Sequence, residues 1–391
     1  MKHKGIILLN KMDLAYIFAL VIFVLSSIMM SFFVDSNTMD IAFFRIIRYV
    51  SIFIALTKIC FCDLKNYSLK KILLICSVMV ILIISSIVSS SRMLVWNAIM
   101  VIAAYGVDFR RMLKNIYVWE GLLVILIIFL ALIGLTTDRL YFRGEQVRHS
   151  LGFKYSTYAP LFLLTLSSIY LYLRKGNLKL IELITLYLLA ILMYVLTDTR
   201  FEPTLVVVLA SMFYGYQRWG NEKWKMMLKK VIIWIVPAAL LVSALAIVAY
   251  DPNNAIWRKI NSFTSDRLSL SSEVIKEYGV KAFGNSIEWV GLSRIYEGEK
   301  SNDEYNAVDN AYLKILVQFG ALAMIIFVYA QVMLVCYSLG EKDYYLQMIV
   351  ILFSIFSILN PHTYEIVFFP FILLINNKRW LLNSKSSNEK D

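Results

Sequence analysis

Arginines gathered in and beside two polar stretches are the residues of this chain best suited to chemistry. A guanidinium group stays charged, is planar and can bond two oxygens of a phosphate at once. Any one of these arginines is most simply a solvated cation or a contact to a lipid headgroup. Together they favour a site that handles a diphosphate, which needs several cations. The set consists of Arg139, Arg143, Arg148, Arg200, Arg267 and Arg294.

Side chains that could transfer protons are fewer, and each has a structural alternative. His149 directly follows Arg148, although a single loop histidine is more often a surface residue. Asp309 precedes an apolar helix and is therefore either a base or an N-cap. Glu202-Pro203 has the pattern of a helix start, and Asn360-Pro361-His362 has the pattern of a turn. Both interpretations stay open for these residues.

The common catalytic and cofactor motifs are missing from the sequence. It contains no Gly-rich phosphate loop, no Walker motif, no paired histidine spacing for a metal and no Gly-x-Ser-x-Gly. Cys60 and Cys62 have no neighbouring histidine, so this pair does not predict a zinc site. Arg45 and Arg48 stand inside an apolar stretch, where a charge is costly and indicates a functional or paired role.

The elements that must carry these residues are apolar helices. Hydrophobic residues make up 60% of the 391 residues and charged residues only 17%, whereas a soluble domain has about 25% charged residues. This composition predicts an all-α polytopic membrane protein that forms a single domain over 1–391. The formal net charge of +12 is explained by lysine and arginine in cytoplasmic loops, and we expect no nucleic-acid partner.

Apolar runs of spanning or near-spanning length predict about 12 transmembrane helices. Lysine and arginine concentrate in alternate connections, which places both termini in the cytoplasm. Two predicted outer segments break that charge pattern: a small loop over about 137–154 and a large extracytoplasmic loop, between spans 9 and 10, over about 251–308. We predict a short helix in the large loop, capped at Ser265-Asp266, and a disordered tail over about 383–391. The predicted spans cover 13–34, 41–57, 70–90, 93–107, 116–136, 156–173, 180–197, 202–217, 230–250, 309–338, 344–359 and 363–376.

Four short motifs occur in order in segments that we predict to face outward. They are Arg148–Phe153, Thr197–Arg200, Asp266–Leu268 followed by Phe283–Asn285, and Asp309–Leu313 running to Phe319-Gly320. With the predicted spans and outer loops, they resemble the Wzy-type polymerases of O-antigen, capsular and exopolysaccharide repeat units, in the O-antigen ligase/polymerase superfamily. The ligases carry a histidine before the asparagine at the position of Asn310, where this chain has Asp309. They also carry a glycine at the position of Ala323. These two departures favour a polymerase over a ligase.

The resemblance implies glycosyl transfer at the outer face of the bacterial cytoplasmic membrane. A growing glycan on undecaprenyl diphosphate would move onto a new lipid-linked repeat unit, and undecaprenyl diphosphate would leave. Cations would stabilise the diphosphate, which suits the six arginines, with Asn310 as a further substrate-binding residue. A base would deprotonate the acceptor hydroxyl, and the candidates are His149, Asp198, Glu202 and Asp309. The family implies no metal and no cofactor. Its implied partners are membrane lipids and a flippase and chain-length regulator of the same pathway.

Two other functions stay open beside the polymerase. An O-antigen ligase would transfer the glycan from its lipid carrier to another acceptor, but the missing histidine counts against it. A lipid-linked oligosaccharide flippase or another transporter would suit twelve spans. However, few ionisable residues stand inside the predicted spans, and no internal repeat is visible. A large outer loop also has no evident use in alternating access, so we prefer the polymerase.

Overall fold

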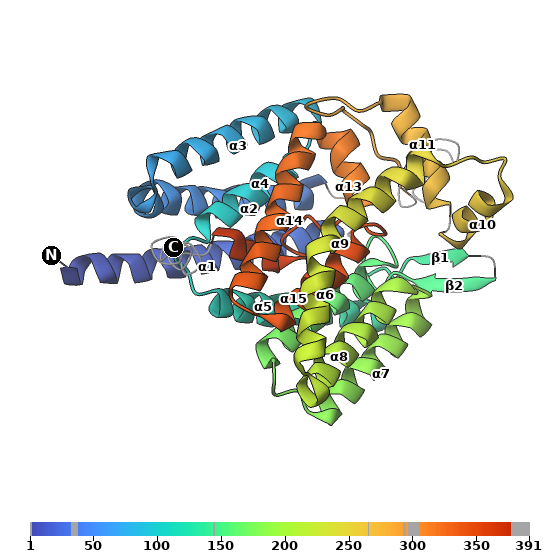
Figure 1. Ribbon diagram of the computed structural model, residues 1–391, viewed down its shortest axis with the longest axis horizontal. Coiled ribbons are helices and arrows are strands. Elements are labelled where there is room, and N and C mark those ends of the chain that lie inside the picture. The colour runs from blue at the N-terminus through green and yellow to red at the C-terminus, as the bar shows by residue number, and fades with distance from the viewer. Residues whose placement is uncertain are drawn as a thin grey trace.

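Apolar α-helices make up most of the chain and form one bundle (Figure 1). The computed structural model describes residues 2–32, 38–143, 145–264, 266–291, 295 and 305–376. In these ranges the α-helices are α1 (Lys2–Ser31), α2 (Thr38–Lys58), α3 (Leu69–Val88), α4 (Met93–Ala103), α5 (Phe109–Leu132), α6 (Tyr158–Arg174), α7 (Leu180–Thr197), α8 (Phe201–Trp219), α9 (Glu222–Val248), α10 (Ala255–Phe263), α11 (Arg267–Tyr278), α13 (Ala311–Lys314), α14 (Ala321–Gly340) and α15 (Tyr344–Phe356). Shorter elements are the π-helical turns η1 (Ile59–Asp63) and η4 (Ile315–Phe319), the 3-10 helices η2 (Leu64–Asn66) and η5 (Pro370–Asn376), and the strands β1 (Leu140–Arg143) and β2 (Gln146–His149).

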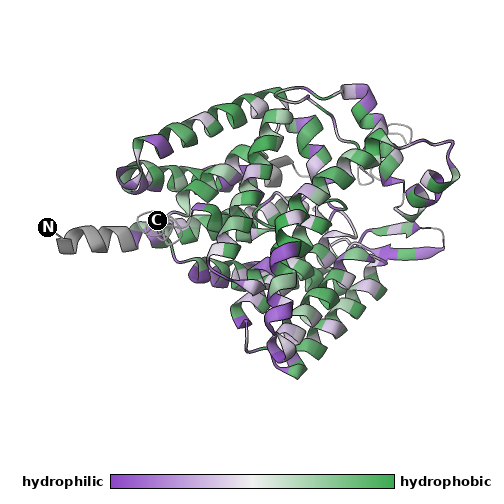
Figure 2. Cartoon of the chain, in the orientation of Figure 1, coloured by the Kyte–Doolittle hydropathy of each residue, from purple (hydrophilic) through white to green (hydrophobic). Residues whose placement is uncertain are grey.

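The hydropathy of these helices agrees with an all-α membrane protein. Figure 2 shows apolar residues along the helices and hydrophilic residues gathered at helix ends and connections. The count of about twelve spans stays a prediction, as does the side of the membrane on which each end lies. By length and composition, six described helices are able to cross a membrane: Lys11–Ser31 within α1, α3, α5, α7, α9 and α14.

Polar residues fix where several of these helices begin. The Ser68 side chain caps α3 by accepting a bond from the Lys71 amide at 3.3 Å. Asp108 caps α5 in the same way, with 2.7 Å to the Arg111 amide, and Asn221 caps α9. Each cap satisfies an amide that the helix itself leaves unpaired. The sequence therefore sets these starts locally, through one residue before each apolar run.

Side chains of α1, α6 and α15 supply much of the buried core. Tyr16, Phe162 and Phe356 are fully buried there, and the Tyr16 hydroxyl donates to the Met100 carbonyl at 2.7 Å. The outer helices α3, α7 and α9 instead leave large apolar side chains exposed, among them Ile181. Apolar side chains on an outer surface are expected where lipid, and not water, is the surrounding solvent.

Two predicted spans differ from the structure near the C-terminal end. The prediction of one continuous span over 309–338 is wrong, because η4 ends at Phe319 and α14 starts as a new helix after Gly320. The stretch 363–376 is no α-helix among the described residues; it consists of turns and the 3-10 helix η5. Pro370, which begins η5, has no amide to donate into a helix. Hydropathy predicted apolar burial correctly here but not the backbone conformation.

The break at Gly320 joins the large loop to the bundle. Lys281 and Ala282 accept bonds from the amides of Ala321 and Leu322, at 3.0 and 3.1 Å. The Asn285 amide donates to the Gln318 carbonyl at 3.1 Å. These bonds satisfy backbone groups that the interrupted helix leaves unpaired, which a membrane protein requires. The segment after α11 is thereby fixed against the start of α14.

The large loop contains the predicted short helix, but with a different cap. Helix α11 is present, and Val274 is buried on the face it turns to the bundle. Asp266 makes no capping bond, and Ser265 lies outside the described residues, as does the predicted tail over 383–391. Instead the Asn261 amide oxygen of α10 accepts from the amides of Leu268 and Ser269, each at 3.1 Å. Helices α10 and α11 are therefore held together through Asn261.

We predict that Gly320→Ala destabilises the protein more than Gly279→Ala does. Both glycines have backbone angles that only glycine adopts readily (φ +93°, ψ 169° and φ +67°, ψ 177°). That conformation costs another residue about 1–3 kcal/mol. A Cβ at Gly279 would meet nothing within 4 Å, whereas one at Gly320 would lie 2.4 Å from the Ala282 carbonyl oxygen. Thermal unfolding midpoints of the two purified variants measure the difference, and equal midpoints would contradict close backbone packing at Gly320.

Candidate functional site

The small loop contains a two-stranded hairpin, an element that the sequence did not predict. Strands β1 and β2 pair antiparallel, with Tyr141 opposite Arg148 and Phe142 opposite Val147. Successive side chains of a strand point to opposite faces. Tyr141 and Arg148 are accordingly buried on one face, while Phe142 and Val147 are exposed on the other. The hairpin projects from the same end of the bundle as α10 and α11 (Figure 1).

Arg148 joins the hairpin to the end of α7. Its Nε atom donates to the Thr197 carbonyl at 3.0 Å, and an Nη atom donates to the Thr199 hydroxyl at 3.4 Å. Thr197 is the last residue of α7, where a carbonyl has no partner in the helix and attracts a cation. Burial of the guanidinium, together with the nearby charge of Arg143, lowers the pKa of Arg148 to about 10. Arg148 is still protonated at neutral pH and keeps its charge in the buried position.

Two arginine–aspartate pairs lie close to Arg148. Arg143 lies 3.3 Å from the Asp198 carboxylate, and its side chain is 40% exposed. Arg267 of α11 lies 3.0 Å from the Asp309 carboxylate and also donates to the Leu359 carbonyl at 2.7 Å. The second pair connects α11 to the segments that precede α13 and follow α15.

Glu202, in the first turn of α8, lies near these groups. It is only 5% exposed, and the charges of Arg267, Arg148 and Asp309 all act on its carboxyl group. The two pairs and Arg148 are therefore parts of one charged site, with three guanidinium groups and three carboxylates. The residues of this site, the outer charge cluster, are Arg143, Arg148, Asp198, Glu202, Arg267 and Asp309.

Tyrosines lie close to this cluster. Tyr305 lies close enough to Asp309, Tyr155 and Arg267 for their charges to act on it. Burial, and the charge of Asp309, raise the pKa of Tyr305 to about 12. Its phenol therefore stays protonated at neutral pH and is able to donate a hydrogen bond. Tyr141 of the hairpin stacks with Tyr155 at 6.4 Å between ring centroids. Aromatic rings with hydroxyl groups are well suited to sugars, which present both apolar faces and hydroxyls.

The remaining predicted residues lie apart from the cluster or take other roles. His149 faces away from Arg148 along β2, and its Nδ1 atom lies 2.5 Å from Asp138. Arg200 is exposed just before α8, and Arg139 is bonded through its backbone to Ser150. Asn310 is buried and caps α13, with its amide also donating to the Ser243 hydroxyl at 2.9 Å. Arg294 lies outside the described residues.

A histidine–glutamate pair was not among the predicted site residues. The Nδ1 atom of His362 lies 2.8 Å from Glu365, whose side chain is buried. The charge of Glu365 acts on Arg48 and on Lys314, and the charge of Asp309 acts on Lys314 as well. Lys314 thus interacts electrostatically with Glu365 of this pair and with Asp309 of the outer charge cluster. The signal was present in the sequence, since Glu365 falls within a predicted apolar span.

The donors of the site favour an anion over a metal ion. Among the residues that the structure describes, no group of three or more His, Cys, Asp or Glu side chains could hold a metal. Guanidinium groups cannot ligate a cation, but they bind phosphate oxygens in pairs.

Comparisons with protein-family models, with curated proteins and with solved structures find no match for this chain.

Loss of the Arg148 guanidinium should loosen the hairpin, whereas loss of the Arg143 guanidinium should not. A bond to a charged, buried donor contributes about 1.5–3 kcal/mol, and an exposed ion pair about 0–1 kcal/mol. In Arg148→Met we expect amide hydrogen exchange over residues 140–149 to accelerate by about 10- to 100-fold. Arg143→Met is the matched control and should accelerate it by less than about fivefold. Equal effects in the two variants would show that Arg148 does not anchor the hairpin.

Proposed function

We propose that this protein polymerises lipid-linked oligosaccharide repeat units by glycosyl transfer at the outer face of the bacterial cytoplasmic membrane. One observation carries the proposal: at one end of an apolar helix bundle, the charges of Arg143 and Arg267, from two distant segments, both act on Arg148. A substrate such as undecaprenyl diphosphate has a long apolar tail next to a diphosphate. It therefore needs cations at the end of membrane helices.

The substrate would bind by exchanging partners within the outer charge cluster. Without it, Arg143 pairs with Asp198 and Arg267 pairs with Asp309, while Arg148 and Arg267 lie close enough to Glu202 for their charges to act on it. A diphosphate competes well for a guanidinium because its oxygens accept two parallel bonds. Arg143 exchanges most easily, since its pair with Asp198 is long and partly exposed. Negative charge then grows on the leaving diphosphate in the transition state, where fixed guanidinium groups stabilise it.

His362 is our candidate for the base. Glu365 accepts from Nδ1, which fixes the proton on that nitrogen and leaves Nε2 able to accept another. In the reaction, the acceptor hydroxyl oxygen bonds to the anomeric carbon of the donor glycan, and its proton moves to Nε2. The bond from that carbon to the diphosphate breaks, and undecaprenyl diphosphate leaves with the electron pair. Asp198 and Asp309 are less suited to this role because each is already paired with an arginine.

Substitution of a cluster arginine should stop polymerisation in the cell. We predict that deletion of the gene leaves single repeat units on the surface, and that wild type, but not Arg267→Gln, restores long glycan. Removal of a group that stabilises developing charge costs on the order of 10²–10³-fold in rate. Gel sizing of the surface glycan is the measurement. Arg218→Gln, at the opposite end of α8, is the control and should restore polymer fully.

Two other outcomes of that experiment would refute the polymerase. Full-length glycan that stays on its lipid carrier would indicate a ligase. Repeat units retained on the inner leaflet would indicate a flippase. Normal glycan in the deletion strain would exclude all three functions.

His362→Gln should abolish turnover while leaving binding of the lipid-linked substrate intact. A positioned base contributes about 10²–10⁴-fold in rate, and glutamine keeps the size and polarity of the side chain. Purified protein and lipid-linked repeat units give the rate, and substrate binding is measured separately. His149→Gln is the matched control, because His149 is bonded to Asp138 away from Arg148. If His149→Gln lost the activity and His362→Gln kept it, our assignment of the base would be wrong.

A further inference from the structure

An apolar groove runs between α3, α4 and α14. It has a volume of about 520 Å³. Side chains of these helices and of η5 line it, among them Val78, Leu82, Leu94, Phe327 and Met333. A channel of this kind on the lipid-facing side of a bundle is filled by a hydrocarbon chain, since no water is present at that depth. The groove therefore predicts a lipid as its occupant.

Two lysines mark one end of this groove. Lys70 and Lys71, in the first turn of α3, line it together with Ser68. Lys70 is exposed. Lys71 donates to the Asn376 amide oxygen at 2.6 Å and lies over the ring of Tyr67 at 4.1 Å. Among the described residues that line the groove there is no carboxylate. The apolar channel thus ends in positive charge that no acidic lining residue compensates.

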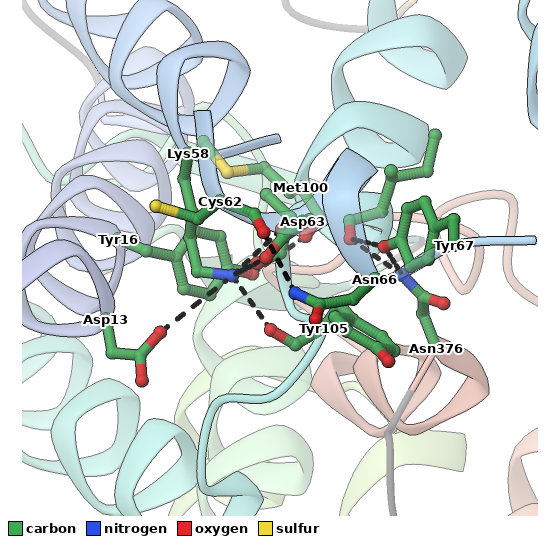
Figure 3. A network of polar contacts seen from close by, with 12 residues as sticks. Asp13, Tyr16, Lys58, Cys62, Asp63, Asn66, Tyr67, Met100, Tyr105 and Asn376 are labelled. Atoms are coloured by element: carbon green, nitrogen blue, oxygen red, sulfur yellow. Dashed lines mark hydrogen bonds and ion pairs between the residues drawn. The ribbon is translucent and has the colours of Figure 1, made fainter. Parts of the chain in front are cut away.

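A rigid polar network holds this end of the groove in place (Figure 3). The Asn376 amide donates to the Tyr67 hydroxyl at 2.9 Å and to the Ile102 carbonyl at 2.7 Å. Beside it, the buried Lys58 donates to both oxygens of Asp63, each at 2.9 Å, and to the Tyr105 carbonyl. Asp63 is the acidic group whose charge acts on Lys71, and Lys58 already compensates it. The network therefore orients Lys71 without neutralising it.

The lysines lie at the opposite end of the bundle from the outer charge cluster. Helix α3 spans 20 residues, about 30 Å of helix. Residues just beyond its far end approach the large loop, where Ser90 lies 3.3 Å from Ser286. In Figure 1 the start of α3 and the hairpin lie on opposite sides of the molecule. A lipid whose phosphate contacts Lys70 would therefore belong to the other leaflet from a diphosphate bound at Arg267.

We propose that this groove is a binding site for an anionic phospholipid of the inner leaflet. The phosphate binds at Lys70 and Lys71, and an acyl chain fills the groove between α3 and α14. Basic pockets between membrane helices on the cytoplasmic side bind headgroups of this kind. Each buried methylene adds to the affinity through the hydrophobic effect. This site does not depend on the polymerase reaction, and the bound lipid would fix α3 against α14.

The test compares two phospholipids that differ only in headgroup. Purified full-length protein is titrated with dioleoyl phosphatidylglycerol or dioleoyl phosphatidylcholine, and bound lipid is counted by native mass spectrometry. We expect retained phosphatidylglycerol, and a loss of its affinity of about 30-fold in Lys70→Gln/Lys71→Gln. Lys223→Gln/Lys230→Gln, which removes the same charge from exposed positions in α9, is the matched control and should bind as wild type does.

A second variant tests the groove separately from the charge. Ala330→Trp places a large side chain in the groove with both lysines intact, and it should also abolish retention. Three results would overturn the proposal. These are equal binding of the two phospholipids, equal loss in the control pair, and preference for undecaprenyl phosphate over phosphatidylglycerol. Thermal midpoints confirm that each variant is folded, and Ala98→Trp replaces Ala330→Trp if the latter does not fold.

Discussion

Compensation of charge in an apolar surrounding determines how the outer end of this bundle is assembled. Removing a charged group from water costs several kcal/mol unless a partner and hydrogen bonds replace the water. Four parts of the chain that are separated in sequence meet here: the hairpin, the connection from α7 to α8, α11 and the segment before α13. Arg148 and Arg267 bring them together, through Thr197 and Asp309, around Glu202. Each segment is therefore held in place by the bonds of a charged side chain.

The same requirement separates structural charges from charges available to a ligand. Lys58 has two carboxylate bonds and a carbonyl at hydrogen-bonding distance, so its charge is used within the protein. Arg143 is half exposed in a long ion pair, and Lys70 lies at the end of an apolar groove without acidic lining residues. An anion binds most favourably to cations such as Arg143 and Lys70, because it displaces few existing bonds within the protein. Each proposed site contains one such cation, Arg143 or Lys70, and the two sites lie at opposite ends of the bundle.

Hydropathy predicted most helices because the apolar run and its cap are local properties, as at Ser68 before α3. It failed where tertiary bonds decide the backbone. The interruption at Gly320 is stable only because Lys281 and Ala282 bond the freed amides, and no local pattern contains that information. Hairpin pairing likewise depends on a buried face, which Arg148 supplies by reaching α7. A charged inward side chain conceals the apolar alternation expected of a strand.

Six of the predicted site residues meet in one cluster, and three of them come from the two loops predicted to face outward. Neighbours in the sequence nevertheless lie apart in the structure. Arg148 and His149 adjoin in one motif, but strand geometry sends them to opposite faces, toward Thr197 and Asp138. His362 and His149 are 213 positions apart in the sequence. The charge of Glu365, the partner of His362, nevertheless acts on Lys314, as the charge of Asp309 does. A charge within an apolar stretch is costly without a partner, and Glu365 has that partner in His362, three residues before it.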